Sequence, residues 1–337
     1  MNRIIPAWET GPERANEIWG LYESLIKRFN LCKKLESNKD DIRKESEELG
    51  EYLYPNGTLC EENLFKLLKT YTDRETLEKN HLIFNLSKGI NAWEHTPKVF
   101  NYTRFSSLSG FKSLVMLLSV ETCPYCNRAF TSTVKIRTTA KKGTGYLRQN
   151  QLDHYKNKNN YPYLALTLPN LIPVCGSCNL HKSDSDEDVL YPYKEGFDDN
   201  YRFVTHPVNG YGYLIGEPCT DNDFKVEIEE TKGKIKTDGY KKRIEKAKTL
   251  LGLGDLYTTH NHYVATIFRK RYIFGEEYID DLYSTYSSLF SSKAEVREMM
   301  YMKSIEDDKL YLSPLSRLTR DVDYEITRLN RKEMKYE

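Results

Sequence analysis

The chain has 337 residues, of which 39% are hydrophobic and 29% are charged, and its formal net charge at pH 7 is +1. This composition is ordinary for a globular protein, and no stretch approaches the roughly 18 consecutive apolar residues that a membrane-spanning helix needs. The first twenty residues carry Glu9, Glu13 and Glu17 where a secretory signal would have its apolar core. We therefore expect a cytoplasmic protein without a membrane partner. The near-zero net charge does not exclude nucleic acid, because a local basic patch is enough to bind it.

Helical periodicity dominates both ends of the chain. Apolar residues recur every three to four positions between residues 13 and 89, which predicts a helical region over residues 1–110. Three short runs with strand-like alternation (YRFVTH, YGYLIGE and FKVEIEE) predict a small antiparallel sheet over residues 197–235. Five periodic segments after them predict a helical C-terminal region over residues 236–337. The expected fold class is α+β, with a distinct module over residues 111–196 between these regions.

The central module contains two cysteine pairs, in ETCPYCNRAF and NLIPVCGSCNLHK. Two residues between cysteines allow both thiolates to face one metal ion, and two such pairs complete a tetrahedral four-thiolate site. Such a site has no open coordination position, so we expect a structural zinc and not a catalytic one. The predicted ligands are Cys123, Cys126, Cys175 and Cys178.

Two alternatives remain for these cysteines. Four unrelated buried cysteines would need no metal, and a redox-active CxxC would normally lie in a βαβ unit, which the pattern here does not indicate. Disulfides are disfavoured in a cytoplasmic protein, because thiols stay reduced there. Cys32, Cys60 and Cys219 are expected to be ordinary small residues.

The segment from the first pair to just beyond the second carries polar residues in a recognisable order. It presents Asp153 and His154 in QLDHYKNK, then Asn170, then Asn179 and Lys182 in CGSCNLHK. This order resembles the HNH (ββα-metal) endonucleases over about residues 120–195, although Asn179 stands where many members carry a final histidine. The wider pattern, with CPYCNR, YPYLALTLPN and a trailing YPY, looks most like the HNH component of Septu-type anti-phage defence systems.

The resemblance implies a zinc-stapled ββα-metal fold and a phosphodiester hydrolase that acts on nucleic acid, with DNA favoured. It also implies an antiviral role beside an ATPase partner subunit, and the flanking helices could serve that partner or a second copy of the chain. One strand would be cut per active site, leaving a 5′-phosphate and a 3′-hydroxyl.

Each residue type in the pattern suits a part of this chemistry. An imidazole can accept a proton from water at neutral pH, so His154 is the predicted general base. The oxygens of Asp153 and Asn179 suit Mg²⁺ or Mn²⁺ better than zinc, so they are the predicted ligands of a catalytic ion. Asn170 matches the position that, in the family, pins the loop behind the histidine. Lys182, one helical turn after Cys178, is predicted to reach a phosphate.

Less specific explanations exist for the same residues. An Asp-His pair in a polar loop is often a solvated turn, and Asn179 could cap a helix that begins near Ser177. His181 could compete as a metal ligand, but its position two residues after Asn179 points it to another side of a helix, so we expect a surface histidine.

The segment from Val134 to Asn160 is predicted to be a basic loop that follows a nucleic-acid backbone. Its seven basic residues accompany a single acidic one, and Lys156 and Lys158 lie closest to the predicted centre. A loop that merely keeps the protein soluble would look similar. The basic residues are Lys135, Arg137, Lys141, Lys142, Arg148, Lys156 and Lys158.

Two other functions fit parts of the pattern. A zinc-stabilised module could bind nucleic acid without cutting it, and an adaptor protein could keep only a vestigial nuclease centre. Intact Asp153, His154 and Asn179 favour the enzyme over the adaptor.

Overall fold

The computed structural model of the chain describes residues 1–84, 93–138, 143–185, 187–215, 217, 220, 222–231 and 237–333. They form two compact units, which interleave along the sequence. The N-terminal unit comprises Ile5–Ser119 and Thr131–Glu187, and the C-terminal unit comprises Met1–Ile4, Val120–Phe130 and Asp188–Glu337. The four consecutive regions expected from the sequence therefore do not coincide with the units, because sequence patterns identify elements but not the elements with which they pack.

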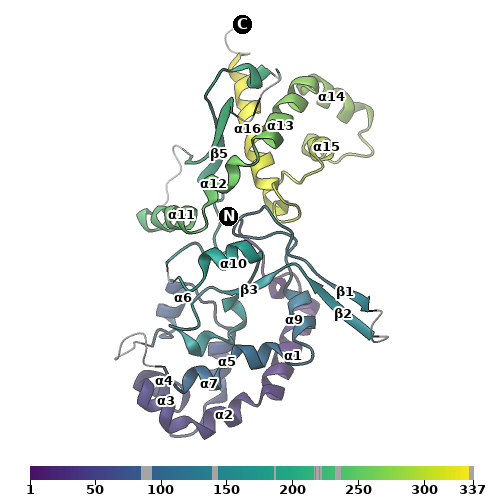
Figure 1. The fold of residues 1–337 in the computed structure, drawn as a ribbon. Coiled ribbons are helices and arrows are strands. Elements are labelled where there is room, and N and C mark those ends of the chain that lie inside the picture. Colours follow the sequence, from purple (N-terminus) through teal and green to yellow (C-terminus); the bar gives the residue numbers. More distant parts are fainter. Residues whose placement is uncertain are drawn as a thin grey trace. The chain divides into compact units, whose positions relative to one another are not determined.

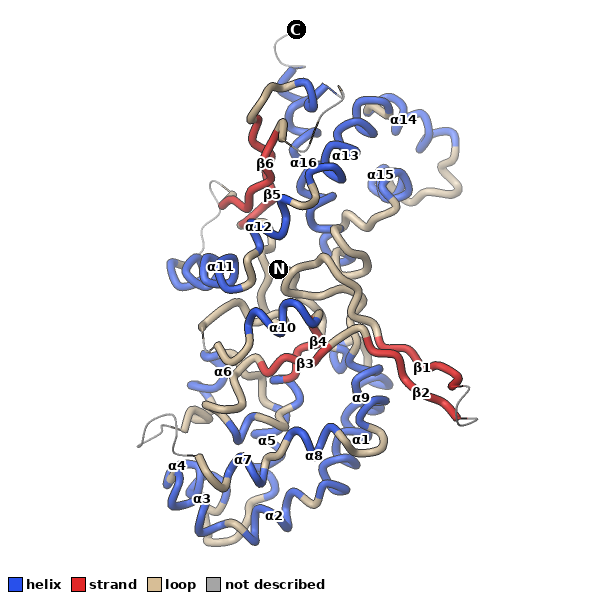
Figure 2. Tube along the Cα trace, in the orientation of Figure 1, coloured by secondary structure: helices blue, strands red, loops and turns tan. Residues whose placement is uncertain are grey.

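Helices and small antiparallel sheets make up both units, so the predicted α+β class is confirmed (Figures 1 and 2). No helix within the described ranges has the length and apolar character that crossing a membrane demands. The helices that precede the first strand in the N-terminal unit are α1 (Pro12–Phe29), α2 (Leu31–Ser37), α3 (Lys39–Glu45), α4 (Glu47–Leu53), α5 (Glu61–Lys69), α6 (Arg74–Lys79), α7 (Thr96–Val99), α8 (Tyr102–Ser106) and α9 (Phe111–Leu118).

Helix α1 shows why the N-terminal helices hold together. Pro12 occupies its first turn, where the missing N–H costs nothing, and Asn30, which caps the C-terminal end, adopts the left-handed conformation. Its buried face carries Tyr22 and Phe29, whose rings both pack edge-on against Phe105 of α8. The Tyr22 hydroxyl also donates to the backbone carbonyl of Leu166 at 2.6 Å. This contact fixes the chain that leads into strand β4 (Leu171–Val174).

A two-stranded antiparallel sheet and a helix form the part of the N-terminal unit that carries the predicted site residues. Strand β3 (Gln151–His154) pairs with β4 (Leu171–Val174), and helix α10 (Gly176–Lys182) follows β4 directly. In this register Asp153 lies opposite Ile172 and His154 opposite Leu171. Short 3₁₀ helices, Pro162–Leu164 and Leu168–Asn170, fill the connection between the strands.

The segment expected as a basic loop over residues 134–160 begins instead as a β-hairpin. Strand β1 (Thr133–Thr138) pairs with β2 (Gly143–Arg148). One face of this hairpin carries the exposed apolar side chains of Val134, Ile136 and Leu147. The hairpin extends away from α1 and α9 of its own unit (Figure 2), although the Tyr146 hydroxyl lies 2.6 Å from the Ser113 hydroxyl of α9. The alternation of apolar and basic residues in TVKIR is a strand pattern that attention to charge alone overlooks.

The C-terminal unit contains one hairpin and six helices within its described part. Strand β5 (Tyr201–Pro207) pairs with β6 (Phe224–Glu230), but the expected middle strand, YGYLIGE, is wrong. Its residues Gly212–Ile215 form a 3₁₀ turn, because Tyr213 turns inward to pack against Phe224 and Phe268. The helices are α11 (Asp238–Leu250), α12 (Leu253–Thr258), α13 (Asn261–Ile273), α14 (Glu276–Thr285), α15 (Lys293–Tyr301) and α16 (Ser316–Glu333).

A buried charge cluster joins four of these helices. Arg271 of α13 is almost fully buried, and its guanidinium pairs with Asp323 of α16 at 3.2 Å and with Glu276 of α14. The Tyr301 hydroxyl of α15 donates to the same Asp323 carboxylate at 2.6 Å. Because each charge is paired, the cluster can hold the helices together without leaving a charge isolated in the core.

Replacing Arg271 with Met should lower the free energy of unfolding by about 3–5 kcal/mol, because Asp323 would remain buried without its cation. Urea unfolding measures the effect. Lys293→Met is the matched control, since its pair with Asp280 is exposed on both sides and should contribute less than about 1 kcal/mol. If Arg271→Met and Lys293→Met lost equal amounts of unfolding free energy, the buried cluster would have no special role in stability.

Candidate functional site

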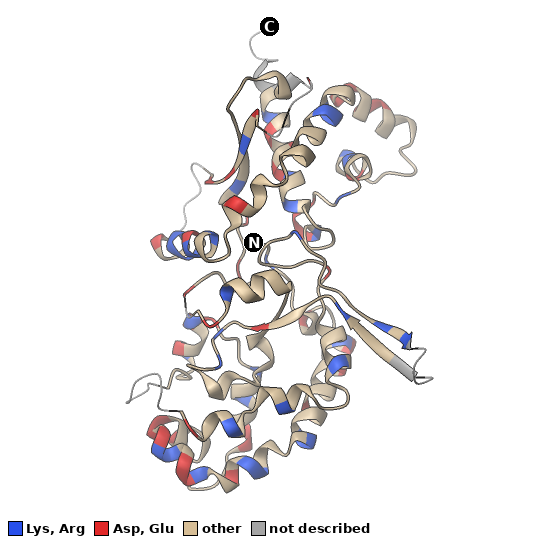
Figure 3. Ribbon diagram, viewed as in Figure 1, with Lys and Arg blue, Asp and Glu red and all other residues tan. Residues whose placement is uncertain are grey.

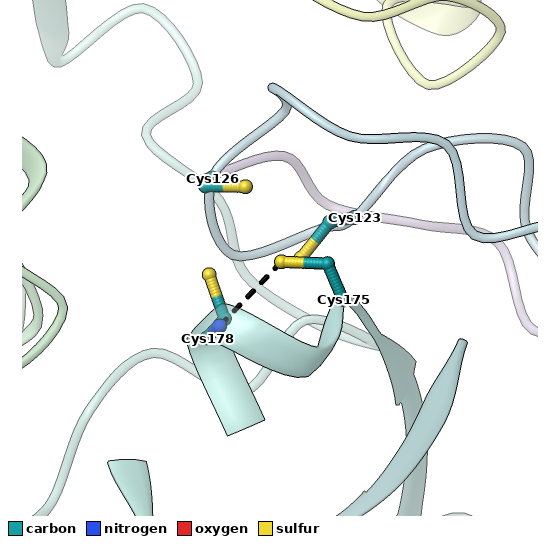
Figure 4. A group of neighbouring side chains, drawn as sticks. All are labelled: Cys123, Cys126, Cys175 and Cys178. Atoms are coloured by element: carbon teal, nitrogen blue, oxygen red, sulfur yellow. Dashed lines mark hydrogen bonds between the residues drawn. The ribbon is translucent and has the colours of Figure 1, made fainter. Parts of the chain in front are cut away.

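The four predicted cysteine ligands come together. The sulfur atoms of Cys123, Cys126, Cys175 and Cys178 all lie within 4.8 Å of one another, and all four residues are buried. Figure 4 shows the sulfurs turned toward one another. None of the four is joined in a disulfide. The predicted convergence of the two pairs is therefore confirmed.

The backbone around each pair has the geometry of a metal-binding knuckle. The Arg128 N–H points to the Cys126 sulfur at 3.4 Å, and the Cys178 N–H points to the Cys175 sulfur at 3.5 Å, the contact dashed in Figure 4. Asn127 adopts a left-handed backbone, with φ of 50°, which closes the first turn. Such N–H donors partly neutralise negative charge on sulfur, so they favour thiolates over neutral thiols.

The donor set fits one tetrahedral ion. Zinc–thiolate bonds of about 2.3 Å place the four sulfurs about 3.8 Å apart, which is compatible with the observed cluster. A buried four-cysteine group of this kind could bind a metal such as zinc. With four sulfur ligands it would leave no position for a substrate.

A cleft of about 530 Å³ lies in the N-terminal unit, over β3 and α10. Asp153, His154 and Asn179, which the sequence singles out, all line it. The side chains around them are mostly polar, so the cleft suits a charged or strongly hydrated ligand. The other lining residues are Tyr102, Gln151, Leu152, Asn157, Lys158, Gly176, Leu180, Ser183 and Asp184.

The His154 imidazole is held in one tautomer. Its Nε2 lies 3.0 Å from the backbone carbonyl oxygen of Ala165, and because a carbonyl only accepts, Nε2 carries the proton and Nδ1 keeps its lone pair. The Tyr102 ring packs edge-on against the imidazole, 4.5 Å between centroids. Burial lowers the pKa of His154 to about 4, aided by the positive charges of Lys158 and Lys182 and opposed by the bond to Ala165. The imidazole is therefore neutral at pH 7 and can accept a proton.

Asn170, which immediately precedes β4, ties the loop behind His154 to the start of that strand. Its fully buried side chain accepts from the Lys156 N–H at 2.8 Å and donates to the carbonyls of Lys156 at 3.0 Å and Leu164 at 3.1 Å. Its own carbonyl accepts from the Tyr155 N–H at 2.9 Å. These four bonds fix the chain immediately after His154, which is the placement that the sequence predicts for a pinning residue.

Asn179 lies on α10 with its side-chain amide oriented by a neighbour. Its Nδ2 donates to Oε1 of Gln151 at 2.6 Å, which leaves Oδ1 as the atom available to a ligand. Cys175, and not Asn179, caps the helix, because the Cys178 N–H points to the Cys175 sulfur. The alternative role of Asn179 as the helix cap is therefore wrong.

Lys182 does not occupy the position that a phosphate contact requires. Its side chain is 2% exposed, and Nζ donates to Oδ1 of Asp153 at 3.1 Å and to the His154 carbonyl at 2.9 Å. The helical spacing brings Lys182 to the site as expected, but α10 turns it toward the protein interior. The predicted phosphate contact is corrected accordingly: Lys182 is the counter-ion of Asp153.

The other basic residues differ in position. Lys158 is exposed and lines the cleft, with Nζ 5.8 Å from the centre of the Tyr102 ring. Lys156 is half-buried, and its Nζ lies over the rings of Tyr155 and Tyr161. Figure 3 shows further Lys and Arg residues on the β1–β2 hairpin, namely Lys135, Arg137 and Arg148. Lys141 and Lys142, like Cys219, lie outside the described residues.

Sequence patterns missed several residues of the cleft. Tyr102 comes from α8, in a region where the sequence shows no site pattern, and Gln151 precedes the Asp-His pair by two residues. Residues at i and i+2 of a strand share a face, so the placement of Gln151 beside Asp153 could have been inferred once β3 was assigned. Nothing local to Tyr102 indicates its contact with His154. His181 is exposed, as expected.

Comparison with known proteins adds nothing to this geometry: no protein-family model, curated protein or solved structure matches the chain. The residues around the cleft and their chemistry are therefore the basis for a functional proposal.

Asn170→Ala should lower the free energy of unfolding of the N-terminal unit by about 1–3 kcal/mol, because it leaves buried backbone groups of Lys156 and Leu164 without partners. Hydrogen exchange should speed up most over residues 155–165. Asn159→Ala is the matched control, since Asn159 is exposed. Unchanged exchange in that segment would show that Asn170 does not pin it.

Proposed function

We propose that the chain is a metal-dependent endonuclease of the HNH class that hydrolyses phosphodiester bonds in nucleic acid, with DNA favoured. The observation that supports it most directly is the ββα arrangement of β3, β4 and α10. It places Asp153, a neutral His154 and Asn179 around one cleft, with Asn170 behind them. Nucleic acid would be recognised through its backbone phosphates.

His154 is the general base in this proposal. Its Nε2–H is committed to the Ala165 carbonyl, so Nδ1 is the nitrogen that takes a proton from the attacking water. Tyr102 and Asn170 restrict the movement of the imidazole and of its backbone. Such restraint keeps the base aligned with the scissile phosphate, which is where much of the rate acceleration in hydrolysis arises.

Asp153 and Asn179 would hold Mg²⁺ or Mn²⁺. They supply a carboxylate and an amide oxygen, the hard donors that these ions prefer, and both face the same cleft. When bound, the ion would offset negative charge on the scissile phosphate and the leaving oxygen. Gln151 contributes by holding the amide of Asn179 so that its oxygen is free.

We further propose that the four-cysteine group binds a structural zinc ion. Cys175 caps α10 and Cys178 lies within it, so the metal would fix the start of the helix that carries Asn179 and Lys182. Zinc would thereby stabilise the cleft without taking part in the chemistry.

Lys158 is the residue best placed to contact a phosphate in the cleft, and the basic residues of the β1–β2 hairpin could extend the contact along the backbone. The wider role we propose, effector of a Septu-type anti-phage system beside an ATPase subunit, rests on the sequence resemblance. Self-association of the chain is proposed on the same sequence resemblance.

Replacing His154 with Ala should reduce cleavage of plasmid or single-stranded DNA by at least about 100-fold, because the general base is lost. The assay should include Mg²⁺ or Mn²⁺, with tRNA as a second substrate. His181→Ala is the matched control, since this exposed histidine on α10 should be dispensable. If the protein only binds nucleic acid, the wild type, His154→Ala and His181→Ala will all show no cleavage.

Cys175→Ser should abolish the bound zinc, expected at about one ion per chain, and lower the midpoint of thermal unfolding by several degrees. Elemental analysis and calorimetry measure the two effects. Cys32→Ser, outside the cluster, should change neither. If the purified protein contained no zinc and chelators left its stability unchanged, the zinc proposal would be wrong.

A further inference from the structure

Lys182 and Asp153 form an ion pair at the base of the candidate cleft. Both side chains are nearly excluded from solvent, at 2% and 3% exposure, and the Nζ–Oδ1 distance is 3.1 Å. The same ammonium donates to the His154 carbonyl at 2.9 Å. One cation thus contacts the predicted metal ligand and the backbone of the predicted base.

The two partners face the cleft differently. Asp153 lines it, whereas Lys182 is not among the described residues that do. Lys182 therefore approaches the carboxylate from the interior of the protein, and a metal ion would approach it from the cleft. Both cations can then act on the same carboxylate without occupying the same space.

A buried carboxylate without a counter-charge would be strongly destabilising. Lys182 supplies that charge when no metal is present, so the local structure can form before the ion arrives. The same positive charge repels a divalent cation, and this repulsion is poorly screened because the pair is buried.

We propose that Lys182 is a positioning residue that competes electrostatically with the divalent ion for Asp153. It stabilises the metal-free site and lowers the affinity of that site for the metal. This inference rests on the proposed function insofar as Asp153 is a metal ligand. By thermodynamic reciprocity, a bound divalent ion must weaken the Lys182–Asp153 interaction by the same factor by which that interaction weakens metal binding.

The test compares Mn²⁺ binding to the wild-type chain, Lys182→Gln and Lys182→Arg by calorimetric titration. Lys182→Gln removes the charge but keeps a hydrogen-bond donor, so its dissociation constant for Mn²⁺ should fall by about tenfold. Lys182→Arg keeps the charge and should bind like the wild type. Asp153→Asn should lose this binding, which identifies the site.

Thermal unfolding gives a second measure that does not depend on activity. Without metal, Lys182→Gln should unfold at a lower temperature than the wild type, and Mn²⁺ should raise its midpoint by more. If the Gln variant fails to fold without metal but folds with Mn²⁺, the proposal is supported. The proposal would be overturned if Lys182→Gln bound Mn²⁺ no more tightly than the wild type. It would also be overturned if neither the wild type nor Lys182→Gln showed Mn²⁺ binding that depends on Asp153.

The two proposals fail separately. A wild-type chain that binds Mn²⁺ through Asp153 but cuts no nucleic acid would disprove the nuclease and leave the role of Lys182 standing. A chain that cuts nucleic acid but gains no Mn²⁺ affinity in Lys182→Gln would do the reverse.

Discussion

The pairing of β3 with β4 is the constraint on which the candidate site depends. It places Asp153 and His154 at the end of one short strand, opposite Ile172 and Leu171, and it delivers the chain into α10. Asn170 completes the arrangement by bonding to the loop that leaves β3. A shift of one residue in this register would turn Asp153 away from Lys182 and His154 away from the Ala165 carbonyl.

Buried charges perform related tasks in the two units. In the C-terminal unit, Arg271 and Asp323 join helices that are distant in sequence. In the N-terminal unit, Lys182 and Asp153 join α10 to β3. Both pairs are enclosed and fully opposed in charge, which is the condition under which ions can be tolerated in a core. The second pair also borders a cleft, through Asp153.

The sequence was sufficient for features that depend on spacing. The CxxC pairs predicted the four-sulfur cluster, and helical periodicity predicted most of the helices, because both are local patterns. The sequence was insufficient where residues distant in the chain determine the position of a side chain. Lys182 turned inward because a buried carboxylate lies across from it, Tyr213 left its expected strand to fill an aromatic core, and Tyr102 joined the cleft from a distant helix. None of these contacts is encoded in a short stretch of residues.

The burial of His154 also determines how its imidazole responds to acidity. Histidines with ordinary surroundings change charge within the physiological range and serve as sensors. The pKa of His154 is lowered to about 4, so its ring carries no charge from mildly acidic to alkaline conditions. The imidazole therefore keeps the same donor at Nε2 and presents the same acceptor at Nδ1 to a ligand in the cleft as cellular pH drifts.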